Sequence, residues 1–370
     1  MTDYVGLTWD HPRGRHALEA AAARVGAGDT LRWEVQPLEG FESAPIDELA
    51  ARYDLLVLDH PHLGDALATE SLTPIDELFD SALVAAWSTA AVGPSLASYR
   101  MAGRLWALPL DAATQVCARV PALVPDAPRT WDEVRALAAE GLVALSLAGP
   151  HAFLSLCSLA VALGDDPGRG ADLFDRETAT EALSLLAALS ATAPAGTSGL
   201  NPIGLLDRMR DRGDIGCVPL VYGYVTYSSP RVAFSDAPHA GGRIGSTIGG
   251  TGIAVSRRRT PSPEVLEHLA WLLDPRTQTA FIPAHDGQPS AAAAWDDEGV
   301  DAAASGFYSS TRATIDQSWV RPRFAGYIPF QSAASAVVRD ALASGRLSAA
   351  LDDLQSLYSS ARSSSPGVFA

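Results

Sequence analysis

The sequence contains no lysine: all 27 of its lysine and arginine positions are arginine. Reactions that need a lysine amine are therefore excluded, including a pyridoxal Schiff base, a P-loop phosphate site and a Ser-Lys dyad. Cysteine is scarce as well. Cys117, Cys157 and Cys217 are odd in number, widely spaced and free of any Cys-x-x-Cys motif. We expect three buried free thiols in preference to a disulfide with one spare cysteine.

Several catalytic signatures are also missing. The chain has no Gly-x-Ser-x-Gly elbow, no His-Glu-x-x-His motif and no Gly-x-Gly-x-x-Gly fingerprint after its first expected strand. These gaps argue against an α/β-hydrolase, a zinc protease and a Rossmann dinucleotide-binding enzyme. The glycines Gly250 and Gly252 stand too late in the chain to form such a fingerprint. No cofactor and no metal site are predicted.

Long apolar runs are absent too. The longest apolar candidate, residues 152–163, is too short to span a bilayer and contains serines. Residues 1–10 lead directly into the first expected strand, with no basic n-region, no long apolar region and no lipoprotein cysteine. We therefore expect a cytoplasmic protein, which would be extracellular only if the sequence had been trimmed ahead of Met1.

The composition is that of a folded, acidic protein. Its 370 residues are 47% hydrophobic and 19% charged, and the net charge is −16 with a pI near 4.8. A chain of this length suits two or three lobes. The acidic balance argues against a nucleic-acid partner, whose phosphates need basic patches, and against an anionic membrane surface.

Strand-like and helix-like segments alternate near the N-terminus. The alternating elements are expected strands at 5–9, 31–35 and 55–59 and expected helices at 15–25 and 45–52. This order predicts an α/β fold with a parallel sheet. A further apolar strand is expected at 142–147, ahead of a helix at 153–163.

Residues 244–281 carry the most informative pattern. Gly249, Gly250 and Gly252 lead into a short apolar strand, and glycine lets the backbone approach a ligand closely. A helix with one apolar face follows, for which Ser262 is the expected N-cap and Pro263 the first residue. An Asp-Pro-x-x-Gln restart closes the segment.

Three other segments add to this pattern. Residues 104–116 contain Leu-Pro-Leu-Asp, residues 285–290 read His-Asp-Gly-Gln-Pro-Ser, and residues 319–327 contain Arg-Pro-Arg followed by Tyr327. Together these segments resemble the motifs of family 1 extracellular solute-binding proteins, the sugar-binding partners of ABC importers. The closing helix departs from the family pattern, because Gln355 stands where the family usually has asparagine.

The resemblance implies a periplasmic-binding-protein-like type II fold, with two α/β lobes and a hinged cleft between them. The N-lobe would contain residues 1–109 and 245–300, and the C-lobe residues 113–240 and 305–370. The chain would cross between lobes near 110–112, 240–243 and 300–305. The expected partners are a small-molecule ligand in the cleft and an ABC permease, and the protein is expected to be a monomer.

Polar residues that follow the first strands are candidates for the cleft. Trp9 and Asp10 follow one strand, and a tryptophan face can stack on a sugar while a carboxylate binds hydroxyls. Asp59 and His60 follow another strand, and with His62 they would be compatible with metal ligation. We favour a hydrogen-bonding role for Asp59 and His60 over a metal site.

The remaining candidates come from the family pattern or from aromatic and basic segments. Each also has an ordinary structural interpretation, such as a hinge hydrogen bond, a core aromatic cluster or a salt bridge. The candidates are Asp111 at the family's acidic position, Tyr222, Tyr224 and Tyr227 as an aromatic wall, Gly250, Thr251, Gln288, Arg321 and Arg323.

These observations predict reversible binding of a small polar solute, with a carbohydrate favoured. The expected absence of export motivates an alternative, in which the same scaffold serves a cytoplasmic enzyme or an intracellular sensor. Asp59, His60 and Asp111 would then supply acid–base chemistry. Arg321 or Arg323 would hold a small carboxylate or an acyl-CoA-type substrate. The sequence does not identify a complete catalytic set, so both hypotheses stay open at this stage.

Overall fold

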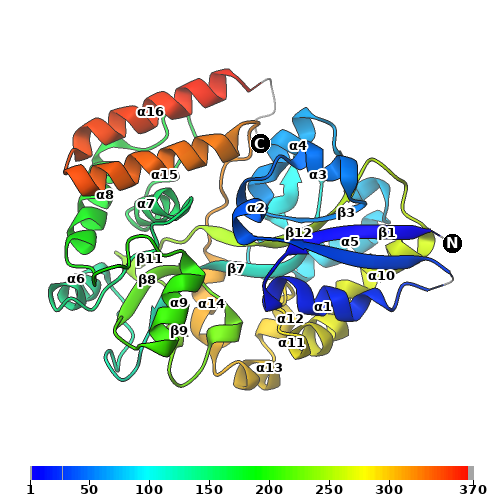
Figure 1. Ribbon diagram of the computed structural model, residues 1–370, viewed down its shortest axis with the longest axis horizontal. Coiled ribbons are helices and arrows are strands. Elements are labelled where there is room, and N and C mark those ends of the chain that lie inside the picture. Colours follow the sequence, from blue (N-terminus) through cyan, green and yellow to red (C-terminus); the bar gives the residue numbers. More distant parts are fainter. Residues whose placement is uncertain (1, 27, 366–370) are drawn as a thin grey trace.

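The computed structural model describes residues 2–26 and 28–365. A mixed sheet of eight strands runs from one lobe of the molecule into the other (Figure 1). The main path follows the order β2 (Thr30–Gln36), β1 (Asp3–Trp9), β3 (Leu55–Leu58), β12 (Ile248–Ser256), β7 (Leu108–Arg119) and β8 (Cys217–Tyr222). Two short strands join from the side, β4 (Leu72–Thr73) on β12 and β9 (Ala233–Ser235) on β7.

The first three strands are parallel, as the alternating sequence predicts. β1 pairs with β2 from Asp3 opposite Thr30 to Trp9 opposite Gln36, and it pairs with β3 on its other side. Helices connect these strands, because parallel neighbours need a crossover. The helices of this lobe include α1 (Pro12–Ala22), α2 (Leu38–Ser43), α3 (Ile46–Arg52), α4 (Leu63–Ala68), α5 (Ser81–Ala90), α10 (Pro263–Leu272), α11 (Ile282–Ala284) and α12 (Ala292–Trp295).

Strands β7 and β12 connect the two lobes, and they run side by side across the middle of Figure 1. β12 comes late in the chain, yet it lies between β3 and β7, antiparallel to both. Their pairing shifts register between Thr251 and Gly252. Gly250 has a φ of +90°, and a Cβ there would lie 2.6 Å from the carbonyl oxygen of Asp111. This irregularity therefore depends on glycine.

The second lobe is mainly helical. Its helices are α6 (Trp131–Ala139), α7 (His151–Ala162), α8 (Arg176–Ala191), α9 (Pro202–Asp211), α15 (Tyr327–Ser344) and α16 (Leu347–Ser363), and α14 (Phe307–Asp316) packs on β7 and β9. Every residue of α7 is buried, and Phe153 packs edge-on against Phe330 of α15 at a centroid distance of 5.4 Å. Among the described residues, no helix is long and apolar enough to cross a membrane.

Local signals in the sequence match the structure in some places and fail in others. Ser262 caps α10 by accepting a hydrogen bond from the backbone N–H of Val265, as predicted. The expected strand at 142–147 is wrong: Val143 makes only an isolated bridge with Cys217. All three cysteines are buried and free, with the sulfurs of Cys117 and Cys217 3.5 Å apart. The proposed lobe boundaries stay a prediction.

Candidate functional site

The ends of strands β1 and β3 meet the second lobe at a group of buried polar side chains. Trp9 is the last residue of β1, and Asp59 directly follows β3. Because β1 and β3 are parallel, both ends lie at the same edge of the sheet. The residues that gather here form an aromatic cluster and an interlobe polar cluster. The polar cluster consists of Glu42, Asp59, His60, His151, Tyr222, Arg321 and Tyr327.

The aromatic cluster surrounds Trp9, which is only 2% exposed. The His11 ring stacks on the indole at a centroid distance of 5.0 Å and an interplanar angle of 8°. Tyr224 meets Trp9 edge-on, and Phe41 packs against it at 5.8 Å. Burial, with Arg13 as the second cause, lowers the pKa of His11 to about 4. His11 is therefore neutral at pH 7 and occupies an indole face that the sequence suggested for a sugar.

Arg13 and Asp111 form a buried ion pair beside this cluster. The Arg13 Nε atom lies 2.8 Å from Asp111 Oδ2, and both side chains are almost completely buried. Arg13 also donates to the carbonyl of Gly223, at 3.0 Å, and its guanidinium lies over the Tyr224 ring. The other Asp111 oxygen accepts the backbone N–H of Thr251 at 2.7 Å. Asp111 thus joins α1, β7 and β12, as the hinge-bond interpretation expects.

Asp59 and Arg321 form the centre of the interlobe polar cluster. Arg321 pairs with Asp59 and donates to Gln331 at 3.0 Å. The His60 Nδ1 atom lies 2.9 Å from Asp59 Oδ1. Burial raises the pKa of Asp59, but Arg321 and then His60 outweigh it and hold that pKa below its ordinary value. Burial, with Arg321 as the second cause, lowers the pKa of His60 to about 4. At pH 7 the carboxylate is charged and the imidazole is neutral.

A second group of the same cluster brings Glu42, His151 and Tyr222 together. The His151 Nε2 atom lies 3.3 Å from Glu42 Oε1, and its ring meets Tyr222 edge-on at 5.8 Å. The Tyr222 ring in turn lies on the backbone of Gly249. Burial is the largest cause of a raised pKa at both Tyr222 and Tyr327. Both phenols therefore keep their protons and remain hydrogen-bond donors.

Several buried polar atoms in this region have no hydrogen-bond partner among the described residues. Those of the polar cluster are His60 Nε2, His151 Nδ1, Tyr222 Oη, Arg321 Nε and Tyr327 Oη. Buried polar atoms are paired in the large majority of cases, and an unpaired one costs about 1–3 kcal/mol. A convergence of such atoms between two lobes is therefore a mark of a binding site.

The other sequence candidates lie outside this convergence. Asp10 is exposed on the surface and pairs with Arg15 at 2.6 Å. Gln288 donates to the carbonyl of Ala112 and accepts from Val225, so it links segments of the protein. Arg323 donates to backbone carbonyls at 97–100. Gly250 and Thr251 form the irregular contact with Asp111.

The structure groups the candidates accordingly. Asp59, His60, Tyr222 and Arg321 lie together, with Trp9, Tyr224 and Tyr227 in the adjoining aromatic cluster. His62 bonds the Phe41 carbonyl instead of sharing a ligand set. Among the described residues, no group of three or more His, Cys, Asp and Glu side chains could hold a metal ion.

Three members of the polar cluster are not among the candidates that the sequence predicts. His151 is the first residue of α7 and does not directly follow a strand, so the pattern that indicates Asp59 does not indicate it. Tyr327 follows the Arg-Pro-Arg motif, of which only the two arginines are sequence candidates. Glu42 stands in a short helix with no sequence signal of its own, because only the approach of the second lobe gives it a partner.

Comparison with solved structures identifies the fold. An ABC transporter solute-binding protein from Agrobacterium radiobacter K84, in complex with ribitol, matches with a TM-score of 0.79 and 19% identity, over 97% of this chain and 98% of that one. One from Agrobacterium vitis S4, with D-mannitol, matches at 0.76 and 17%, over 99% and 100%. Maltose-bound MalE3 of T. maritima matches at 0.77 and 17%, over 98% and 99%.

No protein-family model matches the sequence, and no curated protein does. The structural matches nevertheless cover almost the whole chain. The fold is that of the ABC-transporter solute-binding proteins. The predicted two-lobed type II architecture is confirmed.

Proposed function

We propose that this protein reversibly binds a small, neutral polyhydroxyl compound, a sugar or a sugar alcohol, between its two lobes. The observation that carries the proposal is the convergence of unpaired buried polar atoms from both lobes on one region. These atoms belong to two imidazoles and two protonated phenols, in addition to the guanidinium of Arg321. Such groups suit hydroxyls, which both donate and accept hydrogen bonds.

The charges of the cluster favour an uncharged ligand. Arg321 and Asp59 already neutralise each other, and Glu42 faces His151. A carboxylate ligand would leave one negative charge buried in excess, which is costly. The similar proteins agree with this reasoning, since ribitol, D-mannitol and maltose are all neutral polyols or sugars.

The acid–base alternative has less support from the geometry. Asp111 is held by Arg13 and Thr251, and Asp59 is held by Arg321. The pKa of Asp59 is held below its ordinary value by Arg321, which makes that carboxylate a weak base. Burial raises the pKa of Asp111, but both of its carboxylate oxygens are already bonded, one to Arg13 and one to the backbone N–H of Thr251. Incubation of the protein with its tightest ligand, followed by mass spectrometry, tests whether the ligand is chemically converted. Conversion of the ligand would support the enzyme hypothesis.

An ABC permease is part of the proposal as the partner of the loaded protein. The fold supports this partner, because the proteins with similar structures belong to ABC transporters. Two permease genes beside the coding gene would support a role in transport, whereas metabolic genes without permeases would favour an intracellular role.

The direct test is a calorimetric screen of sugars and polyols, beginning with ribitol, D-mannitol and maltose. We expect at least one of this class to bind, and Tyr222→Phe to weaken it by about tenfold, the value of one lost buried hydrogen bond. Tyr53→Phe is the matched control, because its hydroxyl donates to Glu34 outside the cluster. Absence of binding across the class, or equal loss in both variants, would contradict the proposal.

A further inference from the structure

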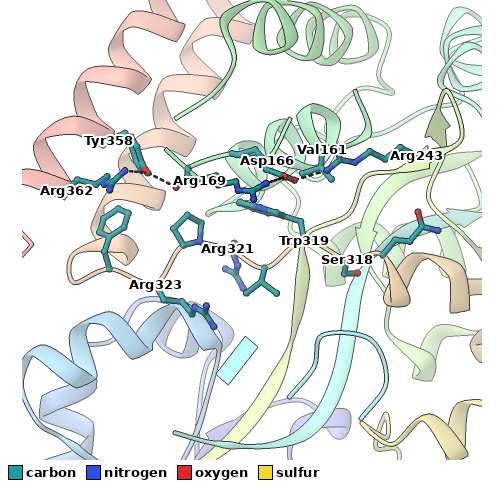
Figure 2. Close-up of a pocket in the computed structure, with 16 residues that line it drawn as sticks. Val161, Asp166, Arg169, Arg243, Ser318, Trp319, Arg321, Arg323, Tyr358 and Arg362 are labelled. Atoms are coloured by element: carbon teal, nitrogen blue, oxygen red, sulfur yellow. Dashed lines mark hydrogen bonds and ion pairs between the residues drawn. The ribbon is translucent and has the colours of Figure 1, made fainter. Parts of the chain in front are cut away.

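A cavity lies next to the convergence of unpaired atoms, beside the segment that leads into α15. Its volume is about 640 Å³, within the range of small-molecule sites. Figure 2 shows its walls: the loop after α7, the end of α16 and the segment from Ser318 to Phe324. Arg321 lines this cavity and also reaches Asp59, so the two regions share one residue.

Arginine dominates the lining of this cavity. Five of the chain's 27 arginines contribute, whereas Asp166 is the one carboxylate among the described lining residues. Arg321 is paired with Asp59, and Asp166 lies between Arg169 and Arg243. The lining nevertheless keeps more arginines than carboxylates in a protein whose net charge is −16. A concave wall that carries one sign of charge concentrates the field inside it and attracts the opposite ion. The five arginines are Arg169, Arg243, Arg321, Arg323 and Arg362.

Asp166 shows how an anion is held in this cavity. Its Oδ1 atom lies 2.8 Å from Arg243, and its Oδ2 atom lies 3.2 Å from Arg169 (Figure 2). Two guanidinium groups thus flank one carboxylate, an arrangement that suits phosphate oxygens equally well. Deeper in the wall, the Nε atoms of Arg321 and Arg323 are buried and have no partner among the described residues.

The loop that carries Asp166 is held in place by α16 and by a hydrogen bond within the loop. The hydroxyl of Tyr358 on α16 donates to the carbonyl of Gly168 at 2.8 Å. The backbone N–H of Gly168 donates to the carbonyl of Leu173 at 2.7 Å. The cavity wall is therefore built into the fold, and its arginines project from anchored backbone.

We propose that this cavity binds a small organic phosphate with at least two negative charges, of about the size of a nucleoside diphosphate. The number of guanidinium groups favours a multiply charged anion, and phosphate supplies nearly two charges on one group at pH 7. Trp319 lines the same cavity and offers an apolar surface to an organic moiety. This site shares Arg321 with the proposed sugar site and goes beyond the proposed function.

The test is calorimetric titration of the whole protein with pyrophosphate and with ADP at low salt. We expect saturable binding that weakens as salt is added. Arg169→Gln and Arg243→Gln should each weaken it about tenfold, since a charge-assisted hydrogen bond is lost. Asp166→Asn should strengthen it several-fold, because the competing carboxylate is removed. Tighter binding of ADP than of pyrophosphate would indicate that the organic moiety contacts Trp319. Equal binding of the two probes would indicate that the cavity recognises only the phosphates.

Arg176→Gln is the matched control, because Arg176 pairs with Asp352 away from the cavity lining. The Arg169 side chain is 83% exposed, so we expect the Arg169→Gln variant to fold normally. A loss of binding in this variant would then report on the site and not on unfolding. Absence of binding by both probes, or equal losses in the Arg169, Arg243 and Arg176 variants, would overturn the proposal. Tyr222→Phe should leave pyrophosphate binding unchanged, so failure of the sugar site and failure of this site are distinguishable.

Discussion

Glu42 and His151 face each other across the two lobes, with the Glu42 Oε1 atom 3.3 Å from His151 Nε2. Glu42 belongs to the short helix α2, and His151 is the first residue of α7. The carboxylate therefore lies at the positive end of the α7 dipole as well as beside the imidazole. The two residues come from distant parts of the chain and from different lobes. Their contact therefore forms only when the two lobes lie close together.

Removing this contact should weaken ligand binding by loosening the approach of the two lobes. Glu42→Ala is expected to reduce the affinity for the best sugar or polyol about five- to tenfold, consistent with about 1 kcal/mol for one polar pair. Calorimetry measures the affinity, and small-angle X-ray scattering measures the compactness of the free protein. Glu39→Ala on the exposed side of the same helix is the control. Equal affinity in the two variants would remove Glu42 from the site.

Breaking the Arg13–Asp111 pair should destabilise the whole protein. Asp111→Ala leaves the Arg13 guanidinium buried without its carboxylate, and the loss of one partner of a buried pair costs about 3–5 kcal/mol. Urea denaturation at pH 7 provides the measurement. Asp10→Ala removes an exposed carboxylate that pairs with Arg15 and should cost less than about 1 kcal/mol. Similar losses in both variants would show that the buried pair contributes little.

The sequence predicts the framework better than it predicts the site. Local patterns are sufficient for β1, for the N-cap Ser262 and for the placement of Asp59 after β3, since each depends on neighbouring residues. Trp9 illustrates the limit: its position was predicted, but the stacked His11 was not. Whether a ring face is free to contact a ligand depends on side chains that are distant in the sequence. The periodicity of the sequence does not show which of these side chains will cover that face.

The irregular pairing of β7 and β12 should depend on Gly250. Gly250→Ala places a Cβ 2.6 Å from the Asp111 carbonyl oxygen on a backbone with a φ of +90°, and both effects destabilise. We expect a loss of at least about 2 kcal/mol in the free energy of unfolding. Gly241→Ala is the control for the backbone effect, because Gly241 also has a positive φ but no atom lies within 4 Å of the added Cβ. A loss no larger than that of Gly241→Ala would rule out the steric part of the argument.

Three buried histidines should make the protein lose stability in mild acid. Burial is the largest cause that lowers the pKa of His11, His60 and His268, each from 6.5 to about 4. Between these values the unfolded chain binds protons that the folded protein does not, so stability rises with pH. It is therefore lost as the pH falls from about 6.5 to about 4, by at most about 1.4 kcal/mol per pH unit for each histidine. Urea denaturation at a series of pH values measures this slope.

His268→Gln measures the contribution of one histidine to the pH dependence of the unfolding free energy. This histidine suits the test because neither of its ring nitrogens has a hydrogen-bond partner among the described residues. The variant keeps a polar side chain but cannot take up the proton, so its stability should fall less steeply between pH 6.5 and 4. His16→Gln is the control, since His16 is exposed and lies beside Asp286 on the surface. Asp59 adds a separate loss below about pH 4, where the unfolded carboxylate protonates before the folded one. If His268→Gln and the unchanged protein gave parallel profiles above pH 4, burial of this imidazole would not be the source of the acid sensitivity.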